Sequence, residues 1–261
     1  MRLEIKDLVF SYAPDSRKVI DGLSLTYESP DVLCILGHNG TGKSTLLQCL
    51  IGDYRPRSGS VEIDGKPVDS FPARELARKI GYIPQTHVPS FDFPVIDVVT
   101  MGRTSLMGRF STPAAEDVER AEEKLRYLHI EHLRNKPYTA ISGGERQLVM
   151  IASALAQEPE ALVLDEPTAH LDFGNQYRFV QLVEQLRESG MGVIMTTHFP
   201  DHALALNGTT AVLDKGGVAA FGEAREVVTD DRLSELYGIE VHVERVGGRS
   251  FCIPGPLEAT V

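Results

Sequence analysis

The eight residues Gly37-His38-Asn39-Gly40-Thr41-Gly42-Lys43-Ser44 are the most informative stretch of this sequence. They fit the pattern GxxxxGK[ST] and stand between a nearly continuous apolar run, DVLCIL (31–36), and a helix-like run, TLLQCLI (45–51). This order predicts a buried strand, a glycine-rich loop that binds phosphate, and a helix. The alternative, a glycine turn that happens to contain lysine, does not account for the two flanking elements.

The residue types of this loop suit a triphosphate. Glycines allow successive backbone N–H groups to turn inward around phosphate oxygens, and the N-terminal end of a helix adds positive potential. The charge of Lys43 would reach the outer phosphates, and the hydroxyl of Ser44 would hold Mg²⁺.

Two acidic residues end a second apolar run. Leu162-Val163-Leu164-Asp165-Glu166-Pro167 predicts a strand whose last residues lie at the carboxyl edge of a sheet, where open α/β proteins bind ligands. We expect Asp165 to anchor Mg²⁺ and Glu166 to accept a proton from the water that attacks the terminal phosphate. A solvated turn after a core strand is the alternative, and the upstream phosphate loop makes it the minor one.

His198 closes a third apolar run, GVIMTTH (192–198), whose carboxyl end we expect in the same crevice. Its imidazole could contact the γ-phosphate or orient the water, although a histidine at a strand end is more often structural. His198 and His202 have the i, i+4 spacing of a metal-binding pair, but Pro200 between them argues against one regular helix. We therefore expect no metal site there.

The remaining pattern predicts a mixed α/β fold. Alternating apolar residues in the first third, such as Leu3 and Ile5, predict short antiparallel strands. Residues 94–156 have a helical pattern, and apolar runs then alternate with helical segments, which predicts crossovers and a parallel sheet. The expected architecture is a P-loop NTPase core with a mostly parallel sheet, an N-terminal antiparallel β subdomain and an inserted α-helical subdomain.

We expect one nucleotide-binding domain over residues 1–261. Its antiparallel strands and P-loop core are expected in residues 1–93 and 157–229, its helical subdomain in 94–156, and a C-terminal extension in 230–261.

Composition excludes several classes of protein. The 261 residues carry a formal net charge of −11, which repels polyanions, so no nucleic-acid partner is expected. The longest apolar stretch, residues 148–156, is far shorter than the roughly 18 to 20 residues that cross a bilayer. The opening MRLEIKDLVF predicts a strand rather than a secretory leader, so we expect residence in the cytosol. Cys34, Cys49 and Cys252 are widely spaced and predict packing thiols.

Ser142-Gly143-Gly144-Glu145 fits a capping box at the start of a helical run. Helix initiation is one interpretation. Two adjacent glycines also suit a backbone that approaches another phosphate closely, and the residues alone leave both interpretations open.

Together these motifs resemble those of the ATP-binding-cassette (ABC) ATPases over nearly the whole chain. Ile141-Ser142-Gly143-Gly144-Glu145-Arg146-Gln147 resembles the family signature, residues 37–45 resemble Walker A and residues 162–166 resemble Walker B. Gln85 resembles the glutamine of the Q-loop, Ala169-His170-Leu171-Asp172 the D-loop, His198 the switch histidine, and Tyr12 the aromatic residue that stacks on adenine. Glu145 and Ala169-His170 depart from the commonest family pattern, in which Gln and Ser-Ala are frequent.

The resemblance implies that two copies pair head to tail around ATP and Mg²⁺. Glu166, His198 and Gln85 would be catalytic, and Ser44, Gln85 and Asp165 would hold the metal. The residues expected to contact ATP are Tyr12, Gly37, His38, Asn39, Gly40, Thr41, Gly42, Lys43, Ser44 and Thr45, with Ser142, Gly143, Gly144 and Glu145 supplied by the second copy.

Asp97-Val98-Val99-Thr100-Met101-Gly102-Arg103 resembles a segment of the ATPases of importers for iron chelates, haem, cobalamin and molybdate or tungstate. The resemblance implies separate integral-membrane permease subunits, an indirect substrate-binding protein, and a peripheral place on the cytoplasmic face of the cell membrane. Iron-chelate import is expected first. The alternatives are an exporter ATPase, a soluble ABC ATPase of DNA repair or translation, and another P-loop enzyme such as a small GTPase. The sequence lacks the coiled-coil arms that a soluble ABC ATPase of DNA repair would have. It also lacks the Asn-Lys-x-Asp motif with which a small GTPase binds guanine.

Overall fold

The computed structural model describes residues 1–85, 92–108, 111–169 and 171–256. Its larger sheet has the strand order β10-β9-β3-β8-β7-β6, in which every neighbouring pair is parallel except β9 and β10. The strands are β3 (Val32–Leu36), β6 (Ile80–Ile83), β7 (Ala161–Leu164), β8 (Gly192–Thr197), β9 (Thr209–Asp214) and β10 (Gly217–Glu223). This sheet carries the three apolar runs of the sequence as neighbours in its middle.

The smaller sheet is antiparallel and has the order β2-β1-β4-β5. Its strands are β1 (Arg2–Phe10), β2 (Ile20–Glu28), β4 (Ser58–Ile63) and β5 (Lys66–Pro67). Leu3 and Ile5 of β1 are buried while their neighbours are more exposed, as the period-2 pattern predicts.

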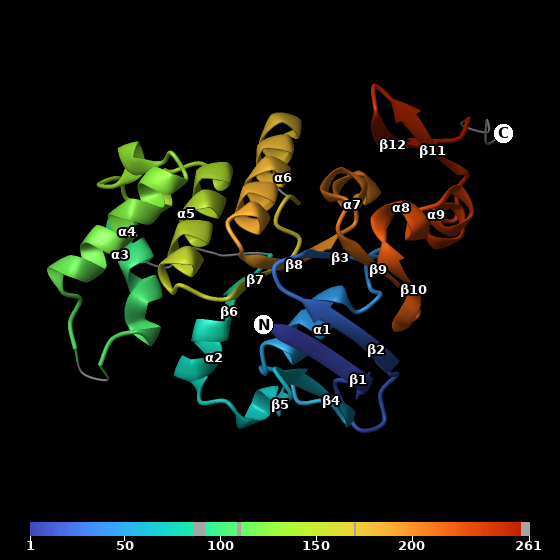
Figure 1. Ribbon diagram of the computed structural model, residues 1–261, viewed down its shortest axis with the longest axis horizontal. Coiled ribbons are helices and arrows are strands. Elements are labelled where there is room, and N and C mark those ends of the chain that lie inside the picture. Colours follow the sequence, from blue (N-terminus) through green and yellow to red (C-terminus); the bar gives the residue numbers. More distant parts are fainter. Residues whose placement is uncertain (86–91, 109–110, 170, 257–261) are drawn as a thin grey trace.

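Helices cover the larger sheet and extend the molecule to one side (Figure 1). The helices are α1 (Lys43–Leu50), α2 (Ala73–Lys79), α3 (Val95–Met101), α4 (Ala115–Tyr127), α5 (Gly143–Ala156), α6 (Phe173–Glu188), α7 (Pro200–Leu206), α8 (Ala224–Val227) and α9 (Asp230–Tyr237). Helices α3, α4 and α5 pack together at one end, and a final hairpin of β11 (Val241–Val246) and β12 (Arg249–Pro254) lies at the other.

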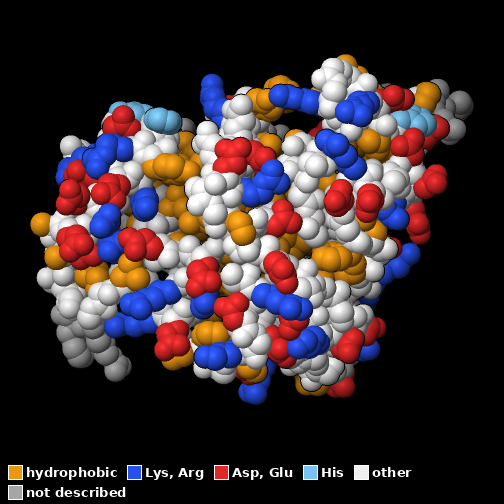
Figure 2. Space-filling view, in the orientation of Figure 1, with side chains coloured by type: hydrophobic (Ala, Val, Ile, Leu, Met, Phe, Trp, Pro, Cys, Tyr) orange, Lys and Arg blue, Asp and Glu red, His pale blue; other side chains and the backbone are white. Residues whose placement is uncertain are grey.

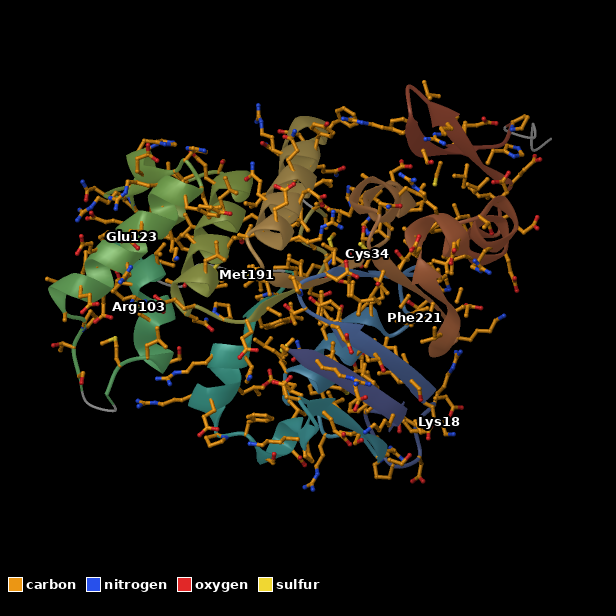
Figure 3. The ribbon with its side chains drawn as sticks, in the orientation of Figure 1. Lys18, Cys34, Arg103, Glu123, Met191 and Phe221 are labelled. Carbon is orange, nitrogen blue, oxygen red and sulfur yellow. The ribbon has the colours of Figure 1, made fainter. Side chains whose placement is uncertain are left out.

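Strand β3 separates two hydrophobic clusters. Leu33 and Ile35 face the antiparallel sheet and α1, whereas Val32, Cys34 and Leu36 face the cluster built by helices α3 to α7. All five side chains are buried, which explains why the sequence run is continuously apolar rather than alternating. Cys34, labelled at the centre of Figure 3, and Cys49 are free thiols, and burial raises the pKa of Cys34 to about 12.

These sheets and helices confirm the mixed α/β fold with a parallel core, an antiparallel β unit and a helical insertion. Helix α6 starts at Phe173, because the side chain of Asp172 accepts a hydrogen bond from the Asn175 amide and so caps it. The segment expected as a C-terminal extension contains α9 and the β11–β12 hairpin, whose turn uses Gly247 and Gly248 at positive φ.

Gly102 and Arg103 have a clear packing role inside the helical insertion. A Cβ atom at Gly102 would lie 2.0 Å from the carbonyl oxygen of Ser153, so α3 and α5 approach too closely for any side chain. The largely buried Arg103 guanidinium (Figure 3) donates to Asp117, to the Ala156 carbonyl and to Glu158. Although burial disfavours its charge, these two carboxylates hold the pKa of Arg103 above its ordinary value.

We predict that Gly102→Ala destabilises the protein, because the added methyl group must push α5 away from α3. The expected loss is about 2–3 kcal/mol in the free energy of unfolding, measured by denaturant titration. Gly217→Ala is the matched control, since a Cβ there would meet its nearest neighbour, the Asp214 oxygen, at 3.9 Å. Equal stability of the two variants would contradict the close approach.

Candidate active site

The glycine-rich loop joins the carboxyl end of β3 to the start of α1. Gly40 and Gly42 have φ values of 84° and 96°, a left-handed conformation that favours glycine. A Cβ at Gly37 would lie 2.7 Å from Thr41 Oγ1 and 2.9 Å from the Leu213 carbonyl oxygen. The loop backbone therefore has the tight curvature that a phosphate cradle needs.

Lys43 lies at the first turn of α1 with only 4 % of its side chain exposed. Its Nζ donates to the carbonyl oxygens of Gly37 (2.8 Å) and His38 (3.3 Å) and lies 3.0 Å from Glu166 Oε1. An ammonium group has three donors, and these three oxygens account for them. The structure thus brings the loop lysine and the second strand-end acid into direct contact.

Ser44 and Asp165 meet at the same place. The Ser44 hydroxyl donates to Asp165 Oδ1 (3.1 Å), and the Asp165 side chain is almost fully buried. Mg²⁺ favours oxygen ligands, often one or two protein groups completed by water and substrate phosphates. The Ser44–Asp165 hydroxyl–carboxylate pair fits such a shared site.

Thr196 of β8 orients both acids. Its fully buried hydroxyl donates to Asp165 Oδ1 (2.8 Å) and accepts from the backbone N–H of Glu166 (2.8 Å). Glu166 has a φ of 43°, which is uncommon for a non-glycine residue and marks a sharply turned strand end. Thr196 therefore fixes the direction in which the two carboxylates leave β7.

Gln85 and His198 contact the other oxygen of Glu166. Gln85 Nε2, just beyond β6, donates to Glu166 Oε2 at 3.1 Å, and His198 Nδ1, just beyond β8, lies 3.5 Å from the same oxygen. His198 Nδ1 is buried and has no hydrogen-bond partner among the described residues. The ends of β6, β7 and β8 thus converge on one carboxylate, as the sequence predicted for β7 and β8.

The segment after His198 joins the site to the C-terminal extension. The Phe199 ring lies 4.0 Å from the His198 ring between centroids, and the Tyr237 hydroxyl donates to the His198 carbonyl at 2.9 Å. His202 Nδ1 lies 3.2 Å from Thr197 Oγ1, and burial lowers the pKa of His202 to about 4. His202 is therefore neutral at neutral pH.

Tyr12 lies beside the start of α1, with 66 % of its surface exposed. Its hydroxyl is 2.9 Å from Thr45 Oγ1, and its ring meets those of Phe10 and Tyr54 edge to face. An exposed, braced aromatic ring next to the phosphate loop can stack on a planar base.

The other loop residues form the wall of the cradle. His38 Nδ1 lies 2.7 Å from the Asn39 carbonyl, and Thr41 Oγ1 donates to the His38 carbonyl at 3.0 Å.

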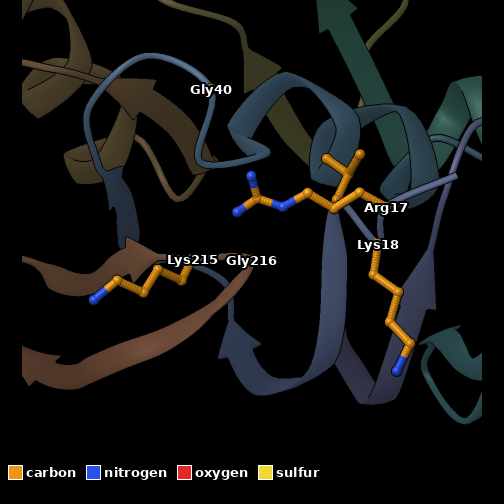
Figure 4. Close-up of a pocket in the computed structure, with 6 residues that line it drawn as sticks. Arg17, Lys18, Gly40, Lys215 and Gly216 are labelled. Atoms are coloured by element: carbon orange, nitrogen blue, oxygen red, sulfur yellow. The ribbon is translucent and has the colours of Figure 1, made fainter.

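A small basic hollow of about 140 Å³ adjoins the loop at Gly40 (Figure 4). In this view Arg17 points toward the space below the loop, whereas Lys18 and Lys215 point away from it. Lys18 bonds to Asp21 and Lys215 pairs with Asp214, while the Arg17 side chain has no ion pair among the described residues. Sequence analysis missed Arg17, because one arginine in a charged loop carries no motif.

The signature residues are not brought into this cluster. The Ser142 hydroxyl accepts from the Glu145 amide, and Glu145 Oε2 accepts from the Ser142 amide at 2.8 Å, so the capping box at α5 is formed. The Ser142 amide, which donates to the carboxylate, holds the pKa of Glu145 below its usual value. In the described structure no hydrogen bond or ion pair joins Ser142 to Glu145 with Lys43, Asp165 or Glu166. His170 of the expected D-loop lies outside the described residues.

Comparison with known proteins gives the family of this chain. The model of the ABC transporter family matches residues 20–169. The chain is 36% identical over 236 residues to the molybdate import ATP-binding protein MolC of Haemophilus influenzae. The match covers 90% of this chain and 87% of MolC. It is 36% identical over 242 residues to the hemin import ATP-binding protein HmuV of Nocardia farcinica. This match covers 92% of this chain and 83% of HmuV.

Solved structures agree with these matches. One, described as an ABC transporter of metal-chelate type in an inward-facing conformation, has a TM-score of 0.86 and 33% identity and covers 99% of this chain and 98% of its own. Another, the dimeric structure of the bacterial ABC transporter cassette MJ0796, has a TM-score of 0.74 and 26% identity and covers 85% and 99%.

The chain therefore belongs to the ABC transporter family. Within that family it is an ATP-binding subunit, and it is an ATPase. Among the helices of the described residues, none combines the length and apolar character that crossing a bilayer requires.

We predict that Thr196→Val lowers ATP hydrolysis about 10- to 100-fold, a loss typical of residues that orient ligating groups. Valine keeps the shape but removes the hydroxyl that holds Asp165 and the Glu166 amide. Steady-state phosphate release measures the effect, and Thr196→Ser should restore most of the rate. Thr210→Val is the matched control, since Thr210 is equally buried in the same sheet but its hydroxyl has no hydrogen-bond partner in the described structure. A similar loss in both variants would mean that Thr196 acts only through packing.

Proposed function

We propose that this chain is the ATP-hydrolysing subunit of a membrane importer, with an iron chelate as its first candidate cargo. The contact of Lys43 with Glu166, beside the Ser44–Asp165 pair, carries the proposal, because a phosphate-binding cation, a carboxylate base and a pair that suits Mg²⁺ lie side by side. Similarity to import ATP-binding proteins over about nine tenths of the chain supports the importer class. The named cargoes of those relatives, molybdate and hemin, are the competing outcomes.

Each residue of the cluster then has a role. Lys43 and the loop amides bind the outer phosphates, and the Tyr12 ring binds the base. Glu166 accepts the proton of the attacking water. Gln85 and His198 both contact the Glu166 carboxylate and so orient this water beside it. Ser44, Asp165 and Gln85 hold Mg²⁺, whose charge offsets that of the phosphates when it is bound.

A second copy is proposed to complete the site. Ser142, Gly143, Gly144 and Glu145 begin α5 and stand apart from the cluster of their own chain, and the capping box leaves the Gly143 and Gly144 amides for the phosphate of another copy. The dimeric cassette among the similar structures supports this arrangement.

The proposed complex also contains permease subunits. We place the chain peripherally on the cytoplasmic face of the cell membrane, with a substrate-binding protein as an indirect partner and no nucleic acid. The surface between Gln85 and Arg103 is proposed to contact the permease, and residues 86–91 of this segment lie outside the described residues. We further propose the domain limits 94–156 for the helical insertion and 230–261 for the extension.

Glu166→Gln is predicted to reduce ATP hydrolysis about 10²- to 10⁴-fold, the usual contribution of a general base. ATP binding should persist, because glutamine keeps the polar contacts and removes a negative charge beside the phosphates. With Mg²⁺ and ATP, light scattering should then show a dimer. The double variant Lys43→Ala/Glu166→Gln, which lacks the phosphate-binding charge, should stay monomeric. A single variant that binds ATP and remains a monomer would refute the two-copy site.

Recovery of the tagged chain from its native membranes is predicted to bring a polytopic membrane protein with it. Reconstituted in vesicles with that partner, the complex should take up a ferric chelate in an ATP-dependent manner, whereas molybdate or haem uptake would reassign the cargo. Exclusively soluble partners would instead favour a non-transport ABC ATPase, and outward movement of cargo would favour an exporter.

A further inference from the structure

A larger hollow lies beside α6, with none of Lys43, Asp165 or Glu166 in its lining. Its volume of about 480 Å³ falls within the range of about 300–1,000 Å³ that is usual for small-molecule sites. Four parts of the chain form its walls, namely α6, the segment from Phe199 through α7, Arg225 of α8, and the β11–β12 turn with the start of β12. Figure 2 shows hydrophobic and Lys or Arg side chains together between α6 and this hairpin.

Three of these parts offer aromatic rings. Tyr177 comes from α6, Phe199 precedes α7, and Phe251 comes from β12. Tyr177 and Phe251 remain more than two-fifths exposed, and exposed apolar groups gathered around one hollow mark ligand-binding grooves. Rings on several sides favour a flat aromatic ligand, which can stack on them or meet their edges.

The acidic residues of this hollow already have partners. Glu184 pairs through Oε1 with Arg187, and Asp201 Oδ1 accepts from the Cys252 amide at 2.7 Å. Glu184 Oε2 is buried and has no hydrogen-bond partner among the described residues, so a ligand with one N–H or O–H group would supply one.

The two arginines of the lining are uncompensated. Neither the Arg225 nor the Arg249 side chain has an ion pair or hydrogen bond within the described part of the chain. The Arg249 guanidinium instead lies 5.5 Å from the Tyr177 ring centroid. His202, also in the lining, is neutral at pH 7 because burial lowers its pKa to about 4. The hollow therefore carries the two guanidinium charges against the single carboxylate charge of Asp201, because Arg187 balances Glu184, and this positive excess favours an anion.

We propose that the hollow between α6, α7 and the β11–β12 hairpin binds a small aromatic organic anion that carries one hydrogen-bond donor. Its ring lies among Tyr177, Phe199 and Phe251, and its acid group lies between Arg225 and Arg249. This site is independent of the ATP site in its residues, and Phe199 links it to His198 through their ring contact.

The probe for the test is 8-anilinonaphthalene-1-sulfonate, a fluorescent aromatic anion with one N–H group. Fluorescence titration of the full chain should show one saturable site per chain that excess Mg²⁺ and ATP do not displace and that persists in Lys43→Ala. The neutral analogue N-phenyl-1-naphthylamine, which lacks the sulfonate, should bind at least about tenfold more weakly, since two charge-assisted contacts are lost. Displacement by ATP, or equal affinity for the neutral analogue, would overturn the proposal.

Two variants, one double and one single, assign the binding to this hollow. Arg225→Gln/Arg249→Gln should weaken sulfonate binding about tenfold or more, whereas Arg245→Gln, an exposed arginine of the same hairpin outside the lining, should leave it unchanged. Ala205→Trp, which removes no group but fills space at the lining, should abolish binding of both probes. Circular dichroism and ATP hydrolysis verify that each variant is folded. Unchanged probe affinity in the folded double variant, or in folded Ala205→Trp, would refute the site.

Discussion

The ion pair between Lys43 and Glu166 is the interaction on which the active site depends. It joins the phosphate loop to the end of β7 in a place where both charges are nearly removed from water. Either charge alone would be strongly unfavourable there, since removing one partner of a buried ion pair typically destabilises a protein by about 3–5 kcal/mol. The neighbouring carbonyls of Gly37 and His38 complete the coordination of the ammonium group. A phosphate oxygen that bonds to Lys43 must displace one of these acceptors, so nucleotide binding and the freedom of Glu166 are linked.

The parallel sheet makes that pairing possible. Because β3, β6, β7 and β8 run in one direction, the residues that follow them meet at a single edge although they lie far apart in sequence. Thr196 fixes the positions of the two acids relative to each other, since its one hydroxyl contacts the side chain of Asp165 and the amide of Glu166. The left-handed backbone of Glu166 is tolerated because this hydrogen bond and the ion pair hold the residue from both ends.

Much of this arrangement was predictable from sequence because it depends on local pattern. The apolar runs before Gly37, Asp165 and His198 predicted strands whose carboxyl ends meet, and the structure brings these three ends together. Thr196 was not recognised, because a hydroxyl within an apolar run has no period or motif. Its position two residues before His198 was the available signal. The β11–β12 hairpin was missed because its strands are largely exposed, so the alternation along them is weak. The placement of Ser142 is a different case, since the proposed two-copy site would leave no contact within one chain.

The hydroxyl of Tyr237 on the carbonyl of His198 has a mechanical consequence. Asp201, three residues beyond His198, also accepts the amide of Cys252, so the histidine segment is bonded to both α9 and β12. The last helix and hairpin thus act as a brace rather than an appendage. If His198 moves during turnover, α9 and the β11–β12 hairpin must move with it or a hydrogen bond must break. The stiffness of this C-terminal part therefore helps to set how readily the imidazole can move.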